Sequence, residues 1–387
     1  MSESLFFSIF LIFSGAAVLA SFALFTRQPL IVAYIVLGVC LGPFGFNLIT
    51  DKSALEEIGH IGIVFLLFLL GLDLQPRNFI QLLSKTALVA FVSAAVIGGI
   101  GFGISYGFAY TFYESVIIGL AITFSSTIIG LKLLPTTVLH HKHTGELVIG
   151  ILLLQDIMAI IILIVLNGSQ TSSNSQQWLY TLLALPGILI FAMGFVRWVL
   201  LPLLRKFDRF HEYIFLLAIG WCLGLAEMAH QFGLSLEIGA FIAGISLANS
   251  PIAQYIATNL RPLRDFFLIL FFFTIGAGFN LGLLGSILAP SLLLAISVLI
   301  FKPVIYRFLL KLTGESKDLS WEVGVRLGQT SEFSLLIAFI AFSLNLIGEE
   351  ASLVIQATAI ITFLVSTYIV VFRYPSPIAI SDRLRRD

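Results

Sequence analysis

The sequence predicts an all-α polytopic membrane protein with about thirteen transmembrane helices. It is 59% hydrophobic and only 11% charged, whereas soluble domains carry about 25% charged residues. Apolar runs of spanning length alternate with short polar loops along the whole chain. The formal net charge is zero, so no basic surface for nucleic acid is indicated.

Thirteen apolar runs are candidates for transmembrane helices. The chain starts with Met-Ser-Glu-Ser, which lacks the positive region of a cleaved signal peptide, so the first run is expected to be a retained helix. The runs are 5–25, 30–49, 58–74, 86–111, 115–134, 145–166, 178–204, 213–232, 234–248, 263–280, 285–309, 320–345 and 351–372.

The distribution of Lys and Arg predicts the orientation. With thirteen spans and an outside N-terminus, the outside loops hold only Lys52, and every inside loop holds Lys or Arg. The tail, 373–387, is then a short cytoplasmic segment with four arginines. Because one miscounted span would scramble this asymmetry, it supports both the count and the orientation.

A carboxylate lies in the middle of the run 145–166. Asp156 follows Leu-Leu-Leu-Gln155, and a charge at this depth costs several kcal/mol unless it faces protein or water. One reading is a structural carboxylate that neighbouring helices satisfy. The other is a site that carries an ion or a proton, which is the default hypothesis for an intramembrane ionisable group.

Two other runs are interrupted by polar residues at their centres. The run 115–134 contains Ser125, Ser126 and Thr127, and the run 320–345 contains Gly-Gln-Thr-Ser-Glu ending at Glu332. Such paired interruptions predict locally unwound helices at a transporter's binding site. The alternative is ordinary packing of Ser and Thr between continuous helices.

The two interruptions lie seven helices apart, which suggests an internal repeat. Segments 30–166 and 234–372 would form two five-helix units with opposite orientations in the membrane. The run 86–111 is rich in glycine and could approach a neighbour closely. The matching run 285–309 contains Lys302, which either extends to the inner surface or points into the core beside Gln155 and Asp156.

Other ionisable residues allow more than one interpretation. Glu237 lies near the outside start of a helix, either as an interfacial carboxylate or as a guard of the outer mouth. His140, His141 and His143 form a small inside cluster whose spacing does not indicate a metal site, while a role in pH sensing is open. Cys40 and Cys222 lie in apolar runs and predict no disulfide framework.

Together these motifs resemble the monovalent cation:proton antiporter-2 family, and within it the membrane domain of the glutathione-gated potassium efflux (Kef) systems. The similarity covers essentially the whole chain. It is carried by Leu-Leu-Leu-Gln-Asp ending at Asp156, Ser-Ser-Thr at 125–127, Gly-Leu-Ser-Leu-Glu-Ile-Gly-Ala-Phe-Ile-Ala-Gly at 233–244, Lys302, and Gly-Gln-Thr-Ser-Glu-Phe at 328–333.

The resemblance implies the sodium/proton antiporter fold, with one transmembrane transporter domain over 1–372 and its moving core in 86–166 and 285–372. It also implies crossed broken helices, an elevator-like shift, a homodimer and a place in the inner (plasma) membrane. The carboxy-terminal nucleotide-binding domain of Kef systems is missing from this sequence. Either a separate cytoplasmic regulatory subunit or truncation of the sequence before that domain would account for this, and control by glutathione or nucleotide stays open.

By resemblance, Asp156 would be the ion-binding carboxylate and Lys302 the core lysine of the family. On physical grounds, Gln155, Ser125, Ser126 and Thr127 can contribute oxygen atoms to a partly dehydrated cation. The charges of the half-helix ends would be balanced by Lys302, Glu332 and Arg326. No metal site, cofactor or enzymatic constellation is expected.

The sequence therefore predicts an antiporter that exchanges a monovalent cation for a proton at one intramembrane carboxylate. The protonated and the cation-paired carboxylate are both neutral and can move through a low-dielectric core, whereas the bare carboxylate cannot do so cheaply. Gln155 favours K⁺ over Na⁺ by resemblance to the potassium-type pattern. The alternatives are a partner-gated, channel-like K⁺ efflux pathway and a non-transporting membrane sensor on the same fold.

Overall fold

The structure, a computed structural model, describes residues 5–49, 53–73, 76–134, 143–168, 175–207, 209–248, 250 and 252–376. Nearly all of them are helical. Seven of the described helices are long and apolar enough to cross a membrane, and five shorter apolar helices accompany them. The all-α membrane fold that the composition predicts is therefore confirmed, while the count of thirteen crossings stays a prediction.

The chain divides into two compact units. The first comprises Met1–Thr50, Ile80–Ala159 and Ile275–Asp387, and the second comprises Asp51–Phe79 and Ile160–Thr274. The first unit contains α1 (Leu5–Phe25), α2 (Leu30–Leu41), most of α4 (Pro76–Gly107), α5 (Phe112–Thr123), α6 (Thr127–Lys132), most of α8 (His143–Gly168), η3 (Leu281–Leu283), α14 (Leu284–Leu312), α15 (Lys317–Arg326), α16 (Glu332–Ser343) and α17 (Glu349–Arg373).

The second unit is built around α3 (Ser53–Asp73) and α12 (Leu236–Ala248), which run side by side. Their contact is close because a glycine on each helix faces the other backbone. A Cβ atom on Gly244 would lie 2.1 Å from the carbonyl oxygen of Phe68, and one on Gly71 would lie 2.6 Å from that of Phe241. The unit also holds α9 (Ser175–Phe195), η2 (Val196–Leu200), α10 (Leu201–Lys206), α11 (His211–Gln231) and most of α13 (Ala253–Ala277).

Each of the thirteen predicted runs contains a helix, but several boundaries differ. Helix α2 ends at Leu41 instead of 49, because Gly42 and Pro43 open a turn there. Helices α4 and α13 begin ten residues before their apolar runs, at Pro76 and Ala253. Hydropathy marks only the apolar part of a helix, whereas the backbone continues through polar residues at its ends.

The glycine-rich helix α4 does approach its neighbour α5. A Cβ atom on Gly119 of α5 would lie 2.5 Å from the carbonyl oxygen of Gly98, and one on Gly101 would lie 3.0 Å from the Cα atom of Gly119. By contrast, Gly99, Gly103 and Gly107 have no atom within 4 Å of such a Cβ. Only part of the predicted glycine surface therefore serves helix packing.

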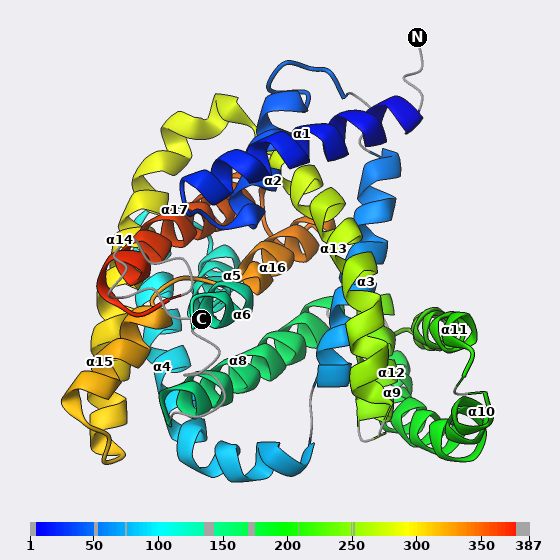
Figure 1. Cartoon of the computed structure of the whole chain (residues 1–387). Coiled ribbons are helices and arrows are strands. Elements are labelled where there is room, and N and C mark those ends of the chain that lie inside the picture. Colours follow the sequence, from blue (N-terminus) through cyan, green and yellow to red (C-terminus); the bar gives the residue numbers. More distant parts are fainter. Residues whose placement is uncertain are drawn as a thin grey trace. The chain divides into compact units, whose positions relative to one another are not determined.

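The two predicted interruptions are real breaks. Helix α5 ends at Thr123 and α6 starts at Thr127, while α15 ends at Arg326 and α16 starts at Glu332. In Figure 1, α5, α6 and α16 lie close together within the first unit. The breaks thus bring backbone groups that no helix satisfies into one region of that unit.

Candidate functional site

Asp156 is buried at the first break. It lies midway along α8, its side chain is 1% exposed, and both carboxylate oxygens lie 3.1 Å from Oγ1 of Thr127. The Thr127 hydroxyl, which belongs to the first residue of α6, donates to the carboxylate. The carboxylate therefore faces the protein interior, in the unwound region, and not lipid.

The other two predicted hydroxyls of this break make different hydrogen bonds. The Ser126 hydroxyl accepts a hydrogen bond from the backbone N–H of Ile129 at 3.0 Å, so it caps α6. The Ser125 hydroxyl donates to the backbone carbonyl of Leu327 at 2.8 Å and ties the first break to the second. Of the hydroxyls predicted to surround the carboxylate, only that of Thr127 contacts Asp156.

The second break is closed by a reciprocal cap. The Ser331 hydroxyl accepts from the backbone N–H of Phe333 at 3.1 Å, and the Ser334 hydroxyl accepts from that of Ser331 at 3.2 Å. Ser334 also donates to the carbonyl of Ala121 in α5. Glu332 is buried as the first residue of α16, where a negative side chain is favourable at a helix N-terminus.

Helix α17 holds the second break from another side. The Thr330 and Thr362 hydroxyls are 2.8 Å apart, and the Ser366 hydroxyl donates to Oε1 of Gln329 at 2.9 Å. All four side chains are buried. Thr362 and Ser366 were not predicted from the sequence, although their spacing of four places them on one helix face.

Lys302 points into the core and not to the surface. Its side chain is fully buried, and Nζ donates to the carbonyl oxygens of Phe124 at 2.6 Å and Gln329 at 2.8 Å and approaches Oγ of Ser125 at 3.3 Å. These acceptors match the three donors of an ammonium group. They belong to the carbonyl ends of both breaks, where a cation is favourable.

Lys302 and Asp156 form no ion pair, although both lie in the described part of the chain. The lysine and the carboxylate instead bind to different helix ends at the two breaks. Lys302 takes the carbonyl ends, and the hydroxyl of Thr127 at the start of α6 bonds to Asp156. The carboxylate therefore has no fixed positive partner among the described hydrogen bonds and ion pairs.

Gln155 has both ends of its amide engaged. Its Oε1 accepts from the backbone N–H of Ser125 at 3.0 Å, and its Nε2 donates to the hydroxyl of Tyr306 at 2.6 Å. Tyr306 is fully buried on α14, four residues after Lys302. Tyr306 was not predicted from the sequence, although its i+4 spacing from Lys302 places both residues on one face.

Arg326 serves another helix end. Its guanidinium donates to the carbonyl oxygens of Leu133, directly after α6, and of Pro375, after α17, both at 2.9 Å, and pairs with Glu322 at 2.8 Å. Its Cζ lies 5.4 Å from the centre of the Tyr374 ring, and burial raises the pKa of the Tyr374 hydroxyl. The predicted role at a negative helix end therefore concerns the far end of α6.

The weaker candidates lie elsewhere. Glu237, buried in the second unit, lies 3.7 Å from Nδ1 of His60. His143 bonds to Glu146 at 3.1 Å and to Glu315 at 2.8 Å. His140 and His141 fall outside the described residues. In the described segments, no group of three or more His, Cys, Asp and Glu side chains could hold a metal ion.

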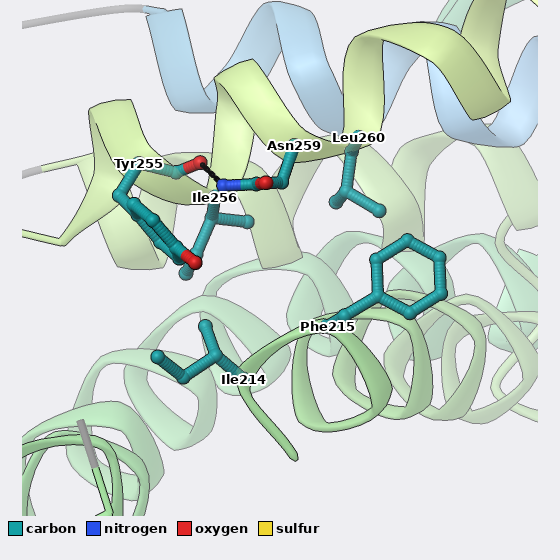
Figure 2. A pocket seen from close by; sticks show the side chains of 6 residues that line it. All are labelled: Ile214, Phe215, Tyr255, Ile256, Asn259 and Leu260. Atoms are coloured by element: carbon teal, nitrogen blue, oxygen red, sulfur yellow. Dashed lines mark hydrogen bonds between the residues drawn. The ribbon is translucent and has the colours of Figure 1, made fainter. Parts of the chain in front are cut away.

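A cavity of about 80 Å³ lies in the second unit between α11 and α13. Figure 2 shows its lining, in which Ile214, Phe215, Ile256 and Leu260 are apolar. The side-chain amide of Asn259 is turned to the carbonyl of Tyr255 at 2.8 Å. No charged side chain is among the residues that line this cavity.

Comparisons with known proteins identify the family and the fold of this chain. Residues 9–373 match the family described as sodium/hydrogen exchanger, transmembrane. The iron transporter MagA of Paramagnetospirillum magneticum is 27% identical over 88% of this chain and 79% of its own length. The glutathione-regulated potassium-efflux system protein KefC of an Enterobacter species is 30% identical over 88% of this chain. The chain spans only 56% of the length of that relative.

A solved structure has the same fold. The sodium proton antiporter MjNhaP1 from Methanocaldococcus jannaschii superposes with a TM-score of 0.70 over 93% of this chain and 94% of its own, at 18% sequence identity. At this identity the likeness extends to the fold and not to the substrate. It supports the antiporter fold that the motifs predict.

Proposed function

Because the chain belongs to the sodium/hydrogen exchanger family, we propose that it exchanges a monovalent cation for a proton at the carboxylate of Asp156. The observation that carries this proposal is the placement of Asp156. It is 1% exposed, lies at a helix break, and is bonded to a neutral hydroxyl and not to a fixed cation. Such a carboxylate needs a mobile positive partner, either a proton or a metal cation.

The proposed exchange follows from the cost of the bare carboxylate. A buried ion without a partner is strongly unfavourable, so the site holds either a proton or a cation while it changes sides. Thr127 offers a hydroxyl oxygen to a partly dehydrated cation, and the break offers backbone oxygens nearby. Binding of one ligand then requires release of the other.

A monovalent cation suits this site better than a multivalent one. The described hydrogen bonds of Asp156 are with one hydroxyl, and the charge of Glu332 also acts on it, whereas divalent and transition-metal sites gather several charged or nitrogen ligands. We propose K⁺ as the preferred cation, supported by Gln155, which adds no second charge beside Asp156, and by the likeness to a potassium-efflux protein. Na⁺ is the competing substrate in the test below.

We also propose elevator-like alternating access, which is supported by the division of the chain into two compact units. The homodimer, the inner-membrane location with the N-terminus outside, and a separate regulatory subunit stay predictions of the sequence.

The test is exchange in proteoliposomes that contain a pH-sensitive dye, challenged separately with K⁺, Na⁺ and Li⁺. The wild-type protein should collapse an imposed pH gradient on addition of its cation. Asp156→Asn keeps the size of the side chain and fixes it as neutral, so exchange should stop. Asp265→Asn removes a carboxylate that is 61% exposed and should exchange like the wild type.

Two outcomes would contradict the proposal. Exchange by the Asp156→Asn protein at near wild-type rate would show that the carboxylate is not the site. Cation flux that continues unchanged without any proton movement would instead indicate the channel-like pathway.

A further inference from the structure

The three-residue segment Phe124–Ser126, between α5 and α6, is held by two side chains of one helix. Lys302 of α14 binds the carbonyl of Phe124 and approaches the hydroxyl of Ser125. Tyr306 follows one turn later and reaches the same segment through Gln155, whose Oε1 accepts from the Ser125 N–H. The Tyr306 hydroxyl also interacts with the side chains of Ser93 and Ser125, so the link through Gln155 must be separated from a direct one. Lys302 thus donates to oxygen atoms of the segment. Gln155, which is bonded to Tyr306, accepts from the buried N–H of Ser125.

The Ser125 N–H and the Tyr306 hydroxyl together fix the orientation of the Gln155 amide. The Ser125 N–H can only donate, so it requires the oxygen of Gln155 to face it. The NH₂ group then points the other way and needs an acceptor in a fully buried place, since Gln155 is 0% exposed. The Tyr306 hydroxyl is that acceptor, at 2.6 Å.

The Tyr306 ring has a separate task. It packs in an apolar cluster with Val89, Leu152 and Leu309, and it is 0% exposed. Phenylalanine would keep this packing and remove only the hydroxyl. The position therefore offers a clean separation between packing and hydrogen bonding.

We propose that Tyr306 is a positioning residue of the exchanger, which acts through Gln155 to fix the first break and thereby the neighbouring hydroxyl of Thr127 at Asp156. Without the Tyr306 hydroxyl, the Gln155 NH₂ group is buried without its acceptor. The amide then rotates toward another hydrogen-bond acceptor. The Ser125 N–H then loses its partner. Thr127, two residues on, is no longer held at the carboxylate, and the cation binds more weakly.

The cation-binding part of this inference rests on the proposed function, whereas the positioning part does not. Hydrogen exchange followed by mass spectrometry measures positioning directly, because the Ser125 amide is bonded to a side chain and not to a helix carbonyl. In Tyr306→Phe, peptides that cover 124–126 should exchange about tenfold faster, as expected for the loss of one buried hydrogen bond of about 1.4 kcal/mol. Tyr368→Phe, at an exposed position of α17, is the matched control.

A double-mutant cycle tests whether Tyr306 acts through Gln155. Gln155→Met alone should accelerate exchange of the same peptides, and adding Tyr306→Phe should change it less than about twofold. The apparent KM for the cation should follow the same pattern, with a rise of about tenfold in either single variant and no further rise in the double variant.

Each other result is decisive. Equal effects of Tyr306→Phe in both backgrounds would show that Tyr306 acts independently of Gln155, and no effect on hydrogen exchange would show that it positions nothing; both overturn the inference. If the wild-type protein exchanges no cation, the proposed function fails, and the hydrogen-exchange cycle still decides on Tyr306.

Discussion

At the scale of the residue, Lys302 connects the two helix breaks through hydrogen bonds as well as through its charge. Its ammonium group joins the carbonyl oxygens of Phe124 and Gln329, which come from different breaks. Those carbonyls belong to chain that has left its helix and cannot use intrahelical partners. The lysine therefore holds two interrupted helices together at the point where each lacks its own hydrogen bonds.

Replacing this lysine should cost stability. Lys302→Met keeps an unbranched side chain but leaves the carbonyls of Phe124 and Gln329 without their donor, at about 1–3 kcal/mol each. The melting temperature in detergent should fall clearly below that of Lys311→Met, which removes an exposed lysine from the same helix. Equal melting temperatures of the two variants would contradict this role.

The proposed site at Asp156 also predicts a pH dependence. If proton and cation compete for Asp156, as we propose, acidification should remove the form that the cation binds. Where the site is mostly protonated, the apparent KM for the cation should rise about tenfold for each unit of pH decrease, as mass action requires for one proton. The maximal rate at saturating cation should change much less. A KM independent of pH across the whole active range would exclude competition at one site.

At the scale of the element, the two helix breaks are stabilised by hydrogen bonds from other helices. Helix α14 supplies Lys302 and Tyr306, α17 supplies Thr362 and Ser366, and α8 supplies the paired Gln155 and Asp156. Arg326 adds a further link, because it joins the carbonyl after α6 to the carbonyl of Pro375 after α17. Unwound backbone is thus tolerated at membrane depth only where protein surrounds it.

The pair α3 and α12 depends on close approach. In Gly244→Ala the new Cβ would lie 2.1 Å from the Phe68 carbonyl, so one helix must shift, at a cost of about 1–3 kcal/mol. Gly220→Ala in α11 meets no atom within 4 Å and should be neutral or slightly stabilising. Thermal melting of both variants in detergent tests this contrast. A Gly244→Ala protein as stable as Gly220→Ala would show that the two helices do not pack as described.

At the scale of the whole molecule, the sequence predicts the helices and the breaks better than the contacts. Long apolar runs identify helices, and the polar groups at 125–127 and 328–332 identify breaks, because both signals are local. The Gln155–Tyr306 bond joins residues 151 positions apart, and no local pattern encodes it. The same limit explains why Ser125 and Ser126 were expected around the carboxylate, while their hydroxyls bond to Leu327 and Ile129.

The hydrogen bonds of Lys302 lead to an expectation for the charge that is moved in each transport cycle. The Lys302 donors bind Phe124, Gln329 and Ser125, and none of them binds Asp156. If the cation binds at Asp156, as we propose, we expect it to replace a proton without displacing the lysine. Gln155, beside Asp156, cannot ionise, so no second proton is available from that position. We expect exchange of one cation for one proton, with no net movement of charge.

Voltage is the decisive variable for this expectation. In sealed proteoliposomes the steady exchange rate should stay nearly constant when the membrane potential is imposed in either direction. Clamping with valinomycin is ambiguous when K⁺ is the substrate, so the potential should be set with another ion, or exchange should be followed with Na⁺. One elementary charge that crosses the membrane gains about 2.3 kcal/mol per 100 mV. A net charge in the cycle would therefore show as a steep response of the rate to voltage, and such a response would exclude one-for-one exchange.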